Sequence, residues 1–307
     1  MKKKKPLGMR IKLEIQQNWI LYLMILPVLV YYIIFHYWPM YGLSMAFQDY
    51  SMRLGPKSPW VGLDNFKRFF NLYETKNLIK NTLTLSVYSL LLDFPLPIIF
   101  ALLLHYLRTP KLRKCVQMVS YAPHFISTVV ICGMITMFTK VDTGVFNIVL
   151  RALGFEAIDF LAKPHMFKHI YVWSAVWQNM GWSAIIYISA LAGVDYEMHE
   201  AAIIDGASKV QRIRFIDIPS IVPTIVMLLI LRCGSLMNVG LEKAFLLQND
   251  LNRSASNIIS VYVYNVGLVD RDYGYSAAVG LFNTMINLIL VVSANQFSKK
   301  VFKESLF

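Results

Sequence analysis

Runs of about 20 apolar residues with almost no charge recur along this chain, each long enough to cross a bilayer as a helix. Inside lipid, every backbone N–H and C=O group must be hydrogen-bonded within the spanning structure, so these runs are predicted to be helices. The alternating pattern of membrane-spanning strands is absent from the sequence. The chain is therefore predicted to be an all-α polytopic membrane protein.

Six transmembrane helices are predicted from these runs. Their approximate ranges are 19–35, 83–104, 117–138, 170–192, 221–240 and 276–297. Together they form one transmembrane domain over residues 19–297, preceded by a basic N-terminus (1–18) and followed by a short tail (298–307). We expect a multi-pass protein of the cell membrane.

Lysine and arginine are unevenly distributed between the predicted loops. With the N-terminus inside, the inner segments hold them at about twice the density of the outer loops, as the positive-inside rule requires. Both termini are then predicted to be cytoplasmic. The net charge of +12 is accounted for by topology and by contact with anionic lipid, so no nucleic-acid binding is expected.

The residue patterns of the common catalytic and metal sites are missing. A Walker A loop needs a Gly-Lys pair to hold phosphates, and the sequence contains none. The segment HEAAI (199–203) begins like the zinc motif HExxH, but Ile203 stands where the second ligand is required. The three cysteines show no CxxC spacing. We expect no catalytic residue, no metal and no cofactor in this chain.

The loop 195–219 interrupts the apolar runs with small and charged residues, and two short helices are predicted there. Asp195 is expected to cap the first, from about residue 196 to 205, and Gly206 to end it in the left-handed conformation. Ser208 and Gln211 form a capping-box pattern that opens the second helix. Pro219 is expected to mark its end.

Small residues and carboxylates lie together on the first helix and its bend. They are Glu200, Ala201, Ala202, Asp205, Gly206 and Ala207. Small residues let another surface come close, and carboxylates beside it suit a basic partner. On physical grounds a docking element and a plain amphipathic connector explain this pattern equally well.

Three segments of this loop resemble the EAA loop of ABC-importer permease subunits. They are Glu200-Ala201-Ala202, Asp205-Gly206-Ala207 and Ile216-Asp217-Ile218-Pro219. The sequence departs from that pattern at Ile218, where leucine is usual, and at Ile213, where phenylalanine is common. Two outer segments, YWPMYG (37–42) and WVGLDNF (60–66), are similar to the maltose-type carbohydrate-uptake subfamily, most closely to permeases for complex oligosaccharides and polysaccharides.

The resemblance implies a type I ABC importer permease fold in a bacterial membrane, with a cytoplasmic coupling helix that seats in a separate ATPase. The residues it assigns to coupling are Glu200, Ala201, Ala202, Asp205, Gly206, Ala207 and Pro219. The implied partners are a second homologous permease subunit forming a heterodimer, two ATPase subunits that bind ATP and Mg, and an extracellular solute-binding protein. The implied cargo is an oligosaccharide.

Polar residues within the predicted fourth and fifth spans are candidates for the substrate pathway, since polar groups in lipid tend to mark such paths. They are Gln178, Asn179, Trp182, Ser183, Arg232, Ser235 and Asn238. Indole faces stack on sugar C–H surfaces, and amides bond hydroxyl groups. Hydrogen bonding between helices explains each individual polar residue about as well.

Arg232 is the most costly of these residues in a membrane, so it is expected to have a partner. Asp93 lies at a similar predicted depth, and an ion pair between the two would be structural or part of a gate. If Arg232 instead faces the pathway alone, it favours acidic sugars such as uronates. An ion-coupled secondary transporter that uses Asp93 and Arg232 as a relay is the alternative function.

Overall fold

The computed structural model describes residues 7–303 of the chain, and within this range the regular structure is helical. One isolated bridge between Gln48 and Trp60 is the sole β pairing among these residues. By length and composition, four described helices can span a membrane, or five if one strongly bent pair is counted. Parts of the predicted N-terminus (1–6) and tail (304–307) lie outside the described residues.

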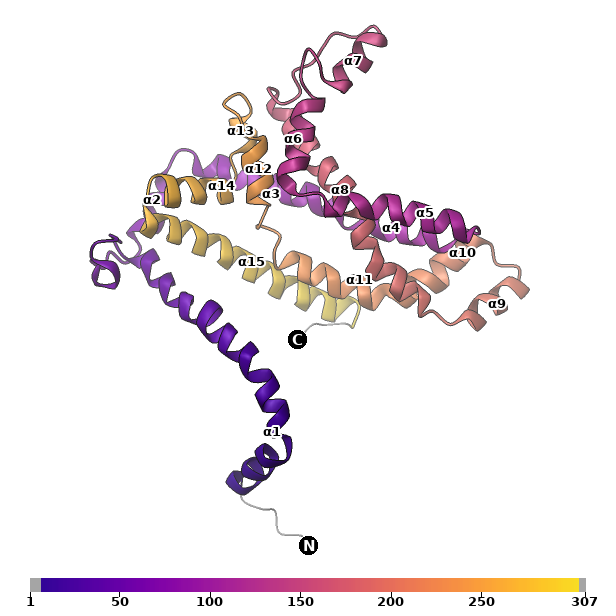
Figure 1. Ribbon diagram of the computed structural model, residues 1–307, viewed down its shortest axis with the longest axis horizontal. Coiled ribbons are helices and arrows are strands. Elements are labelled where there is room, and N and C mark those ends of the chain that lie inside the picture. Colours follow the sequence, from indigo (N-terminus) through magenta and orange to yellow (C-terminus); the bar gives the residue numbers. More distant parts are fainter. Residues whose placement is uncertain (1–6, 304–307) are drawn as a thin grey trace.

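The first apolar segment stands apart from the rest of the molecule. Helix α1 (Leu7–Tyr32) continues as a π-helix, η1 (Ile33–Tyr37), and a 3₁₀ helix, η2 (Trp38–Phe47). The apolar part, Gln16–Phe47, is longer than the predicted 19–35, and its most apolar window is 0% buried. Figure 1 shows α1 projecting from the other helices. Its apolar surface is therefore left for lipid or for another chain.

The second span is built from two consecutive helices that follow the short surface helix α2 (Asp64–Asn71). These are α3 (Thr75–Asp93) and α4 (Pro95–His105), which together make an apolar segment of 31 residues. Pro95 stands at the start of α4, where its missing N–H group is least harmful. The segment contains the predicted range 83–104 and begins eight residues earlier.

The prediction of one continuous helix over 117–138 is wrong. Helix α5 (Pro110–Tyr121) ends in a 3₁₀ turn, η4 (Ala122–Phe125), and α6 (Thr128–Phe138) leaves at a bend of 99°. Pro123 lacks an N–H donor and clashes with a continuing helix, which explains the break. The Ser127 side chain then accepts from Val130 N and starts α6 anew.

After α7 (Val145–Ala152), the predicted fourth span lies within α8 (Pro164–Ala192), a helix of 29 residues. This helix is long enough to cross a membrane but is not among the four apolar candidates. Its polar side chains, among them Gln178 and Asn179, lower its hydropathy. Figure 1 shows α8 running alongside α4 and α5, so these polar groups have protein neighbours.

The predictions that a helix ends at Pro219 and that the fifth span reaches residue 240 are both wrong. After α9 (Tyr196–Ile204), the segments α10 (Lys209–Arg212), η5 (Ile213–Asp217) and α11 (Ile218–Cys233) form one helix. The π-helical spacing of η5 and the position of Pro219 in the first turn of α11 accommodate the proline. The helix ends at Cys233, beyond which Met237 N donates to the Asn287 side chain.

The last part of the chain consists of short helices followed by one long span. These are α12 (Leu241–Leu247), α13 (Arg253–Ser256), α14 (Ile259–Tyr264), η6 (Asn265–Val269) and α15 (Tyr273–Val301). Helix α15 contains the predicted sixth span and packs against α11 and η2.

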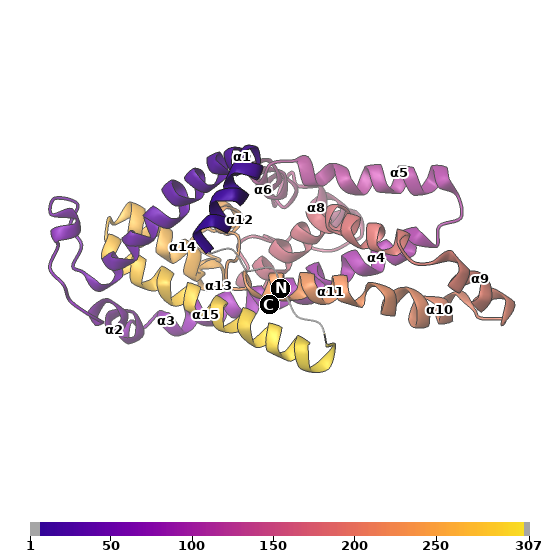
Figure 2. The same cartoon turned by 90° about the horizontal axis from the view of Figure 1, so that it is seen from below.

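Helices α4, α8 and α11 pack around a core of small and branched side chains. The core residues are Ala101, Leu102, Ala184, Tyr187, Leu191 and Ile221. Small residues at such contacts let helix backbones approach closely, and packing of this kind holds membrane helices together. Figures 1 and 2 both place the α4–α5 turn, α9 and α10 at one end of the molecule, with α2 at the other. We call the former the loop end.

Candidate functional site

A cavity of about 690 Å³ opens between α3, α4, η4, α8 and α11. Four of the residues predicted for the substrate pathway line it: Asn179, Trp182, Ser183 and Arg232. Asp93 lines it as well. The fold therefore brings residues of the predicted second, fourth and fifth spans to one space.

The other three predicted pathway residues lie outside this lining and bond to the protein. Gln178 donates to the Ile126 carbonyl at 3.1 Å, and the Ser235 hydroxyl donates to the Arg232 carbonyl at 3.3 Å. The Asn238 side-chain oxygen accepts from Asn283 and Asn287 on α15, at 3.1 and 3.0 Å. The Gln178 and Asn238 bonds join separate segments, as in the helix-packing alternative that the sequence left open, whereas the Ser235 bond is local to its own turn.

A stacked pair of rings forms one wall of the cavity. The His124 and Trp182 ring centroids are 4.5 Å apart and their planes differ by 6°. The Asn179 side-chain oxygen lies 3.0 Å from His124 Nδ1 and holds the imidazole in place. His124 is not among the predicted pathway residues, because it lies where a continuous apolar span was predicted. The proline beside it, Pro123, is the signal that marks the break.

Asp93 and Arg232 lie together at the cavity. Arg232 Nη2 is 3.5 Å from Asp93 Oδ2, and the arginine side chain is 50% exposed while the aspartate is 18% exposed. The Lys243 ammonium is buried, lies over the Tyr171 ring at 5.2 Å and has no hydrogen-bond partner in the described chain. It also acts electrostatically on Asp93. Asp93 is thus paired with Arg232 and is also influenced by a second, buried cation, which the sequence did not reveal.

The caps and the bend predicted for the loop 195–219 are confirmed. Asp195 accepts from Glu197 N at the start of α9, and the capping box of Ser208 and Gln211 is complete. Gly206 has φ +80°. The N–H groups of Gly206 and Ala207 bond back to residues 203 and 202, which is the Schellman arrangement of a helix C-terminus.

The first helix of this loop presents carboxylates and apolar side chains to solvent. Glu200 and Asp205 are exposed, as are Ile203 (52%) and Ile204 (85%). Among the other predicted docking residues, Ala201, Gly206 and Pro219 are exposed and Ala202 and Ala207 are half-buried. An exposed apolar patch rimmed by charge is typical of a surface that another protein covers.

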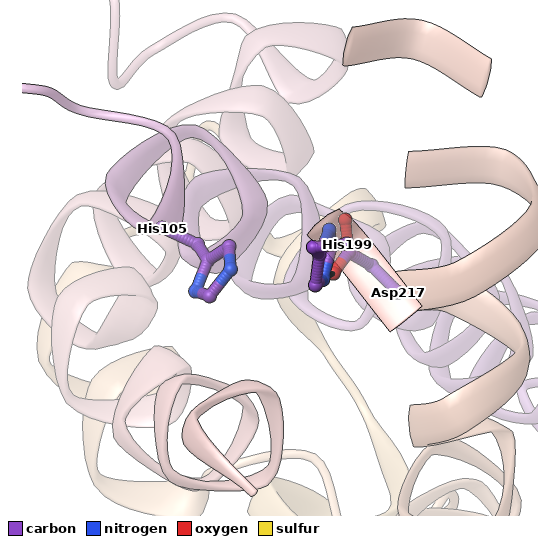
Figure 3. A group of neighbouring side chains, drawn as sticks. All are labelled: His105, His199 and Asp217. Atoms are coloured by element: carbon purple, nitrogen blue, oxygen red, sulfur yellow. Dashed lines mark ion pairs between the residues drawn. The ribbon is translucent and has the colours of Figure 1, made fainter. Parts of the chain in front are cut away.

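Three side chains from distant parts of the chain meet beneath the loop: His105 of α4, His199 of α9 and Asp217 of η5. Figure 3 shows His199 beside Asp217, with His105 to one side of them. The ligand atoms of the three lie within 4.8 Å of one another, a grouping that the failed HExxH pattern did not predict. His199 Nε2 is 3.2 Å from Asp217 Oδ1, and Asp217 is fully buried.

Tyr106 fixes the other oxygen of this aspartate. Its hydroxyl donates to Asp217 Oδ2 at 2.6 Å. Burial raises the pKa of Tyr106, and the bond to Asp217 raises it further, so the phenol keeps its proton as a donor. Asp217 thus ties α9 to the end of α4 and to the start of α11.

Comparison with known proteins shows which family this chain resembles. The family model for the inner membrane component of binding-protein-dependent transport systems matches residues 93–303. Protein LplB of Bacillus subtilis (strain 168) is 44% identical over 288 residues, covering 94% of this chain and 91% of LplB. The polygalacturonan/rhamnogalacturonan transport system permease protein YteP of the same organism is 41% identical over 307 residues, covering 100% of this chain and 95% of YteP.

Solved structures agree with these relatives. A chain of a bacterial ABC transporter involved in the import of the acidic polysaccharide alginate has a TM-score of 0.89 and 38% identity, covering 95% of this chain and 99% of its own. A second structure of the alginate transporter, in complex with an alginate pentasaccharide-bound periplasmic protein, has the same TM-score at 37% identity, covering 95% of this chain and 98% of its own. This family does not favour an ion-coupled secondary transporter. The chain therefore belongs to the family of binding-protein-dependent transport system inner membrane components, the permease subunits of ABC importers.

Proposed function

We propose that this chain forms half of the translocation pathway of an ATP-driven importer for oligosaccharides that carry carboxylate groups. The cavity between α4, α8 and α11 binds the sugar. The loop 195–219 docks onto a separate ATPase subunit, and conformational changes driven by ATP hydrolysis are transmitted through it. A second, homologous permease subunit completes the pathway as a heterodimer.

The lining of the cavity is the observation that carries this proposal. Its volume of about 690 Å³ falls within the range of small-molecule sites. The stacked Trp182 and His124 rings offer a flat face for sugar C–H groups, and Asn179 and Ser183 offer hydrogen bonds to hydroxyl groups. A rigid aromatic platform with a few polar groups is suited to a sugar ring.

The charges at the cavity favour an acidic sugar. Arg232 lies 3.5 Å from Asp93 at the cavity, and the buried Lys243, outside the cavity lining, also acts electrostatically on Asp93. The half-exposed guanidinium has further N–H groups for a second acceptor. Guanidinium groups bind carboxylates strongly through paired hydrogen bonds. YteP is a polygalacturonan/rhamnogalacturonan transport permease and the alginate transporter imports an acidic polysaccharide, which supports an acidic cargo for this chain as well.

The exposed patch of α9 supports docking of an ATPase. Ile203 and Ile204 supply apolar contact, while Glu200 and Asp205 supply charges for basic partner residues. Because this chain has no Gly-Lys pair, ATP and Mg are expected in two partner subunits. The loop end and both termini then face the cytoplasm, and an extracellular solute-binding protein delivers the sugar at the other side. The alginate transporter with its periplasmic protein is the precedent for that partner.

Transport measured in reconstituted vesicles tests the cargo. The Arg232→Gln variant should lose uptake of oligogalacturonate by about tenfold, the effect of one charge-assisted hydrogen bond, and keep uptake of a neutral oligosaccharide of equal length. Arg253→Gln, which removes an exposed arginine outside the cavity, is the matched control. Equal losses for acidic and neutral sugars would contradict the acidic cargo.

The coupling role is tested by the double variant Glu200→Lys and Gly206→Pro. The first change reverses a docking charge and the second is incompatible with φ +80°. Stimulated ATP hydrolysis should collapse while membrane insertion persists. Purification of the tagged wild-type chain should bring down an ATPase and a second permease, and their absence would overturn the importer proposal.

A further inference from the structure

A second cavity, of about 540 Å³, lies at the loop end, outside the proposed sugar path. We call it the basic pocket, because its charged or ionisable lining residues are all basic, apart from two tyrosines. The basic ones are His105, Arg108, Arg113, His199, Lys209 and Arg212. They come from two places: the end of α4 with the α4–α5 turn and the first turn of α5, and the loop 195–219.

The four permanently charged side chains of this pocket have no acidic partner. Within residues 7–303, none of Arg108, Arg113, Lys209 and Arg212 forms an ion pair within 4 Å. The buried Asp217 is not an ion-pair partner of any of them: its Oδ2 accepts from Tyr106, and its Oδ1 lies 3.2 Å from His199 Nε2. The pocket therefore holds a surplus of positive charge inside a partly enclosed space.

Two of the guanidinium groups are held with a buried donor unused. Arg113 Nη2 donates to the Leu107 carbonyl at 3.0 Å, and Arg212 lies over the Tyr106 ring at 5.6 Å. In the described chain, the Nε atoms of both arginines are buried and have no acceptor. Buried donors of this kind are rare in folded proteins, since each loses hydration without replacement. A ligand with acceptor oxygens, bound in the pocket, would accept hydrogen bonds from these two Nε–H groups.

The positive charges of the pocket favour an anion over a metal cation as its ligand. A divalent metal at His105, His199 and Asp217 would sit beside two arginines, and the Tyr106 bond already uses one aspartate oxygen. A phosphate anion instead meets planar guanidinium groups, whose geometry matches its oxygens. We propose that the basic pocket binds a phosphate group, that of an anionic phospholipid head group at the cytoplasmic membrane surface.

The lipid source follows from the place of the pocket, and this step rests on the orientation in the proposed function. Basic pockets between the cytoplasmic ends of membrane helices are suited to lipid head groups. Free phosphate shares the chemistry and is the second source to test. A bound phosphate bridges Arg113 on α5 and Arg212 on α10, and so ties the ATPase-docking loop to the α4–α5 turn.

Native mass spectrometry of the purified transporter, titrated with phosphatidylglycerol, tests the proposal. The double variant Arg113→Gln and Arg212→Gln should weaken the tightest lipid adduct by about 30-fold, the effect of two basic residues near a charged surface. Lys114→Gln with Arg214→Gln removes the same charge from exposed positions outside the pocket and should change that adduct much less. Titration with phosphatidylcholine plus inorganic phosphate identifies a soluble source.

Each outcome decides the matter. A phosphatidylglycerol adduct lost only in the pocket variant supports the lipid site. Phosphate binding without lipid binding, lost in the same variant, supports the anion site and overturns the lipid source. Equal losses in both double variants, or an adduct seen only after the ATPase is removed, overturn the proposal, the latter because a partner's acidic residue then fills the pocket. Binding is read directly, so failure of transport leaves this test intact.

Discussion

The central cavity and the basic pocket both contain arginine side chains, but they differ in whether the chain provides a carboxylate partner for them. In the cavity, Arg232 has a carboxylate 3.5 Å away, so a cation inside the membrane is partly neutralised by its own chain. At the basic pocket, Asp217 Oδ2 accepts from Tyr106 and Oδ1 lies 3.2 Å from His199, and Arg113 and Arg212 form no ion pair within the described chain. The first arrangement holds its counter-charge within the chain, whereas the second leaves its cations open to a counter-charge from outside the chain.

The difference follows from the surroundings of each site. A free cation at the centre of a membrane is costly, so its partner must be built into the fold. At the membrane surface, anionic lipid and partner proteins supply negative charge, and an unmatched arginine is tolerated until they bind. Four substitutions, in order of decreasing effect, test how far the two sites differ.

Gly181→Ala should have the largest effect, and it acts on the cavity side. A Cβ atom at Gly181 would lie 2.3 Å from the Ser120 carbonyl oxygen, so α5 and α8 would have to separate. We expect a loss of about 2 kcal/mol in the free energy of unfolding, seen as a lower Tm. Gly280→Ala on α15, where nothing lies within 4 Å, is the control and should be neutral or slightly stabilising. Equal effects would mean that this helix contact does not shape the cavity.

Asp93→Asn removes the carboxylate that pairs with Arg232 at the cavity. It leaves Arg232 with an uncharged neighbour, and we expect a loss of about 1–2 kcal/mol, below the value for a fully buried pair because the arginine is half exposed. The double variant with Arg232→Gln should recover most of this loss. A double-mutant cycle of thermal unfolding measures the coupling. Additive effects would show that the two side chains do not interact.

Trp182→Ala removes the platform of the cavity. Loss of one face of the stacked pair should lower sugar-stimulated ATP hydrolysis by roughly tenfold, the upper range for an aromatic contact. Trp177→Ala, also on α8 but outside the cavity lining, is the matched control. If both variants lose equal activity, the platform has no special role.

Ser208→Ala should have the smallest effect, and it acts at the loop end. It removes the N-cap of α10 and half of the capping box, which is worth about 1 kcal/mol. The global Tm should change little, while amide hydrogen exchange at residues 209–212 should increase. An unchanged exchange rate would contradict the assignment of the cap.

The helices were predictable where their signals are local. Asp195, Gly206, Ser208 and Gln211 act on backbone groups within a few residues of themselves, and each does what its position in the sequence predicts. The spans failed where a distant residue or a change of helix type intervened. The Asn287 side chain takes the Met237 N–H group from 50 positions away, and η5 carries the helix past Pro219.

Ionic contacts were likewise only partly predictable from the sequence. The sequence indicates that an arginine in a membrane needs a partner, and Asp93 was a candidate by depth alone. His124 and Lys243 gave no such signal, because their roles depend on the break at Pro123 and on the burial of α12.

The sequence alone predicts the helical class, the presence of several membrane spans and the caps and bend of the loop 195–219. These follow from hydrogen-bond satisfaction in lipid and from contacts between neighbouring residues. The sequence does not predict which polar residues share the cavity or which cations have no acidic partner. Those facts depend on the packing of α4, α8 and α11, which brings together atoms that sequence distance does not relate.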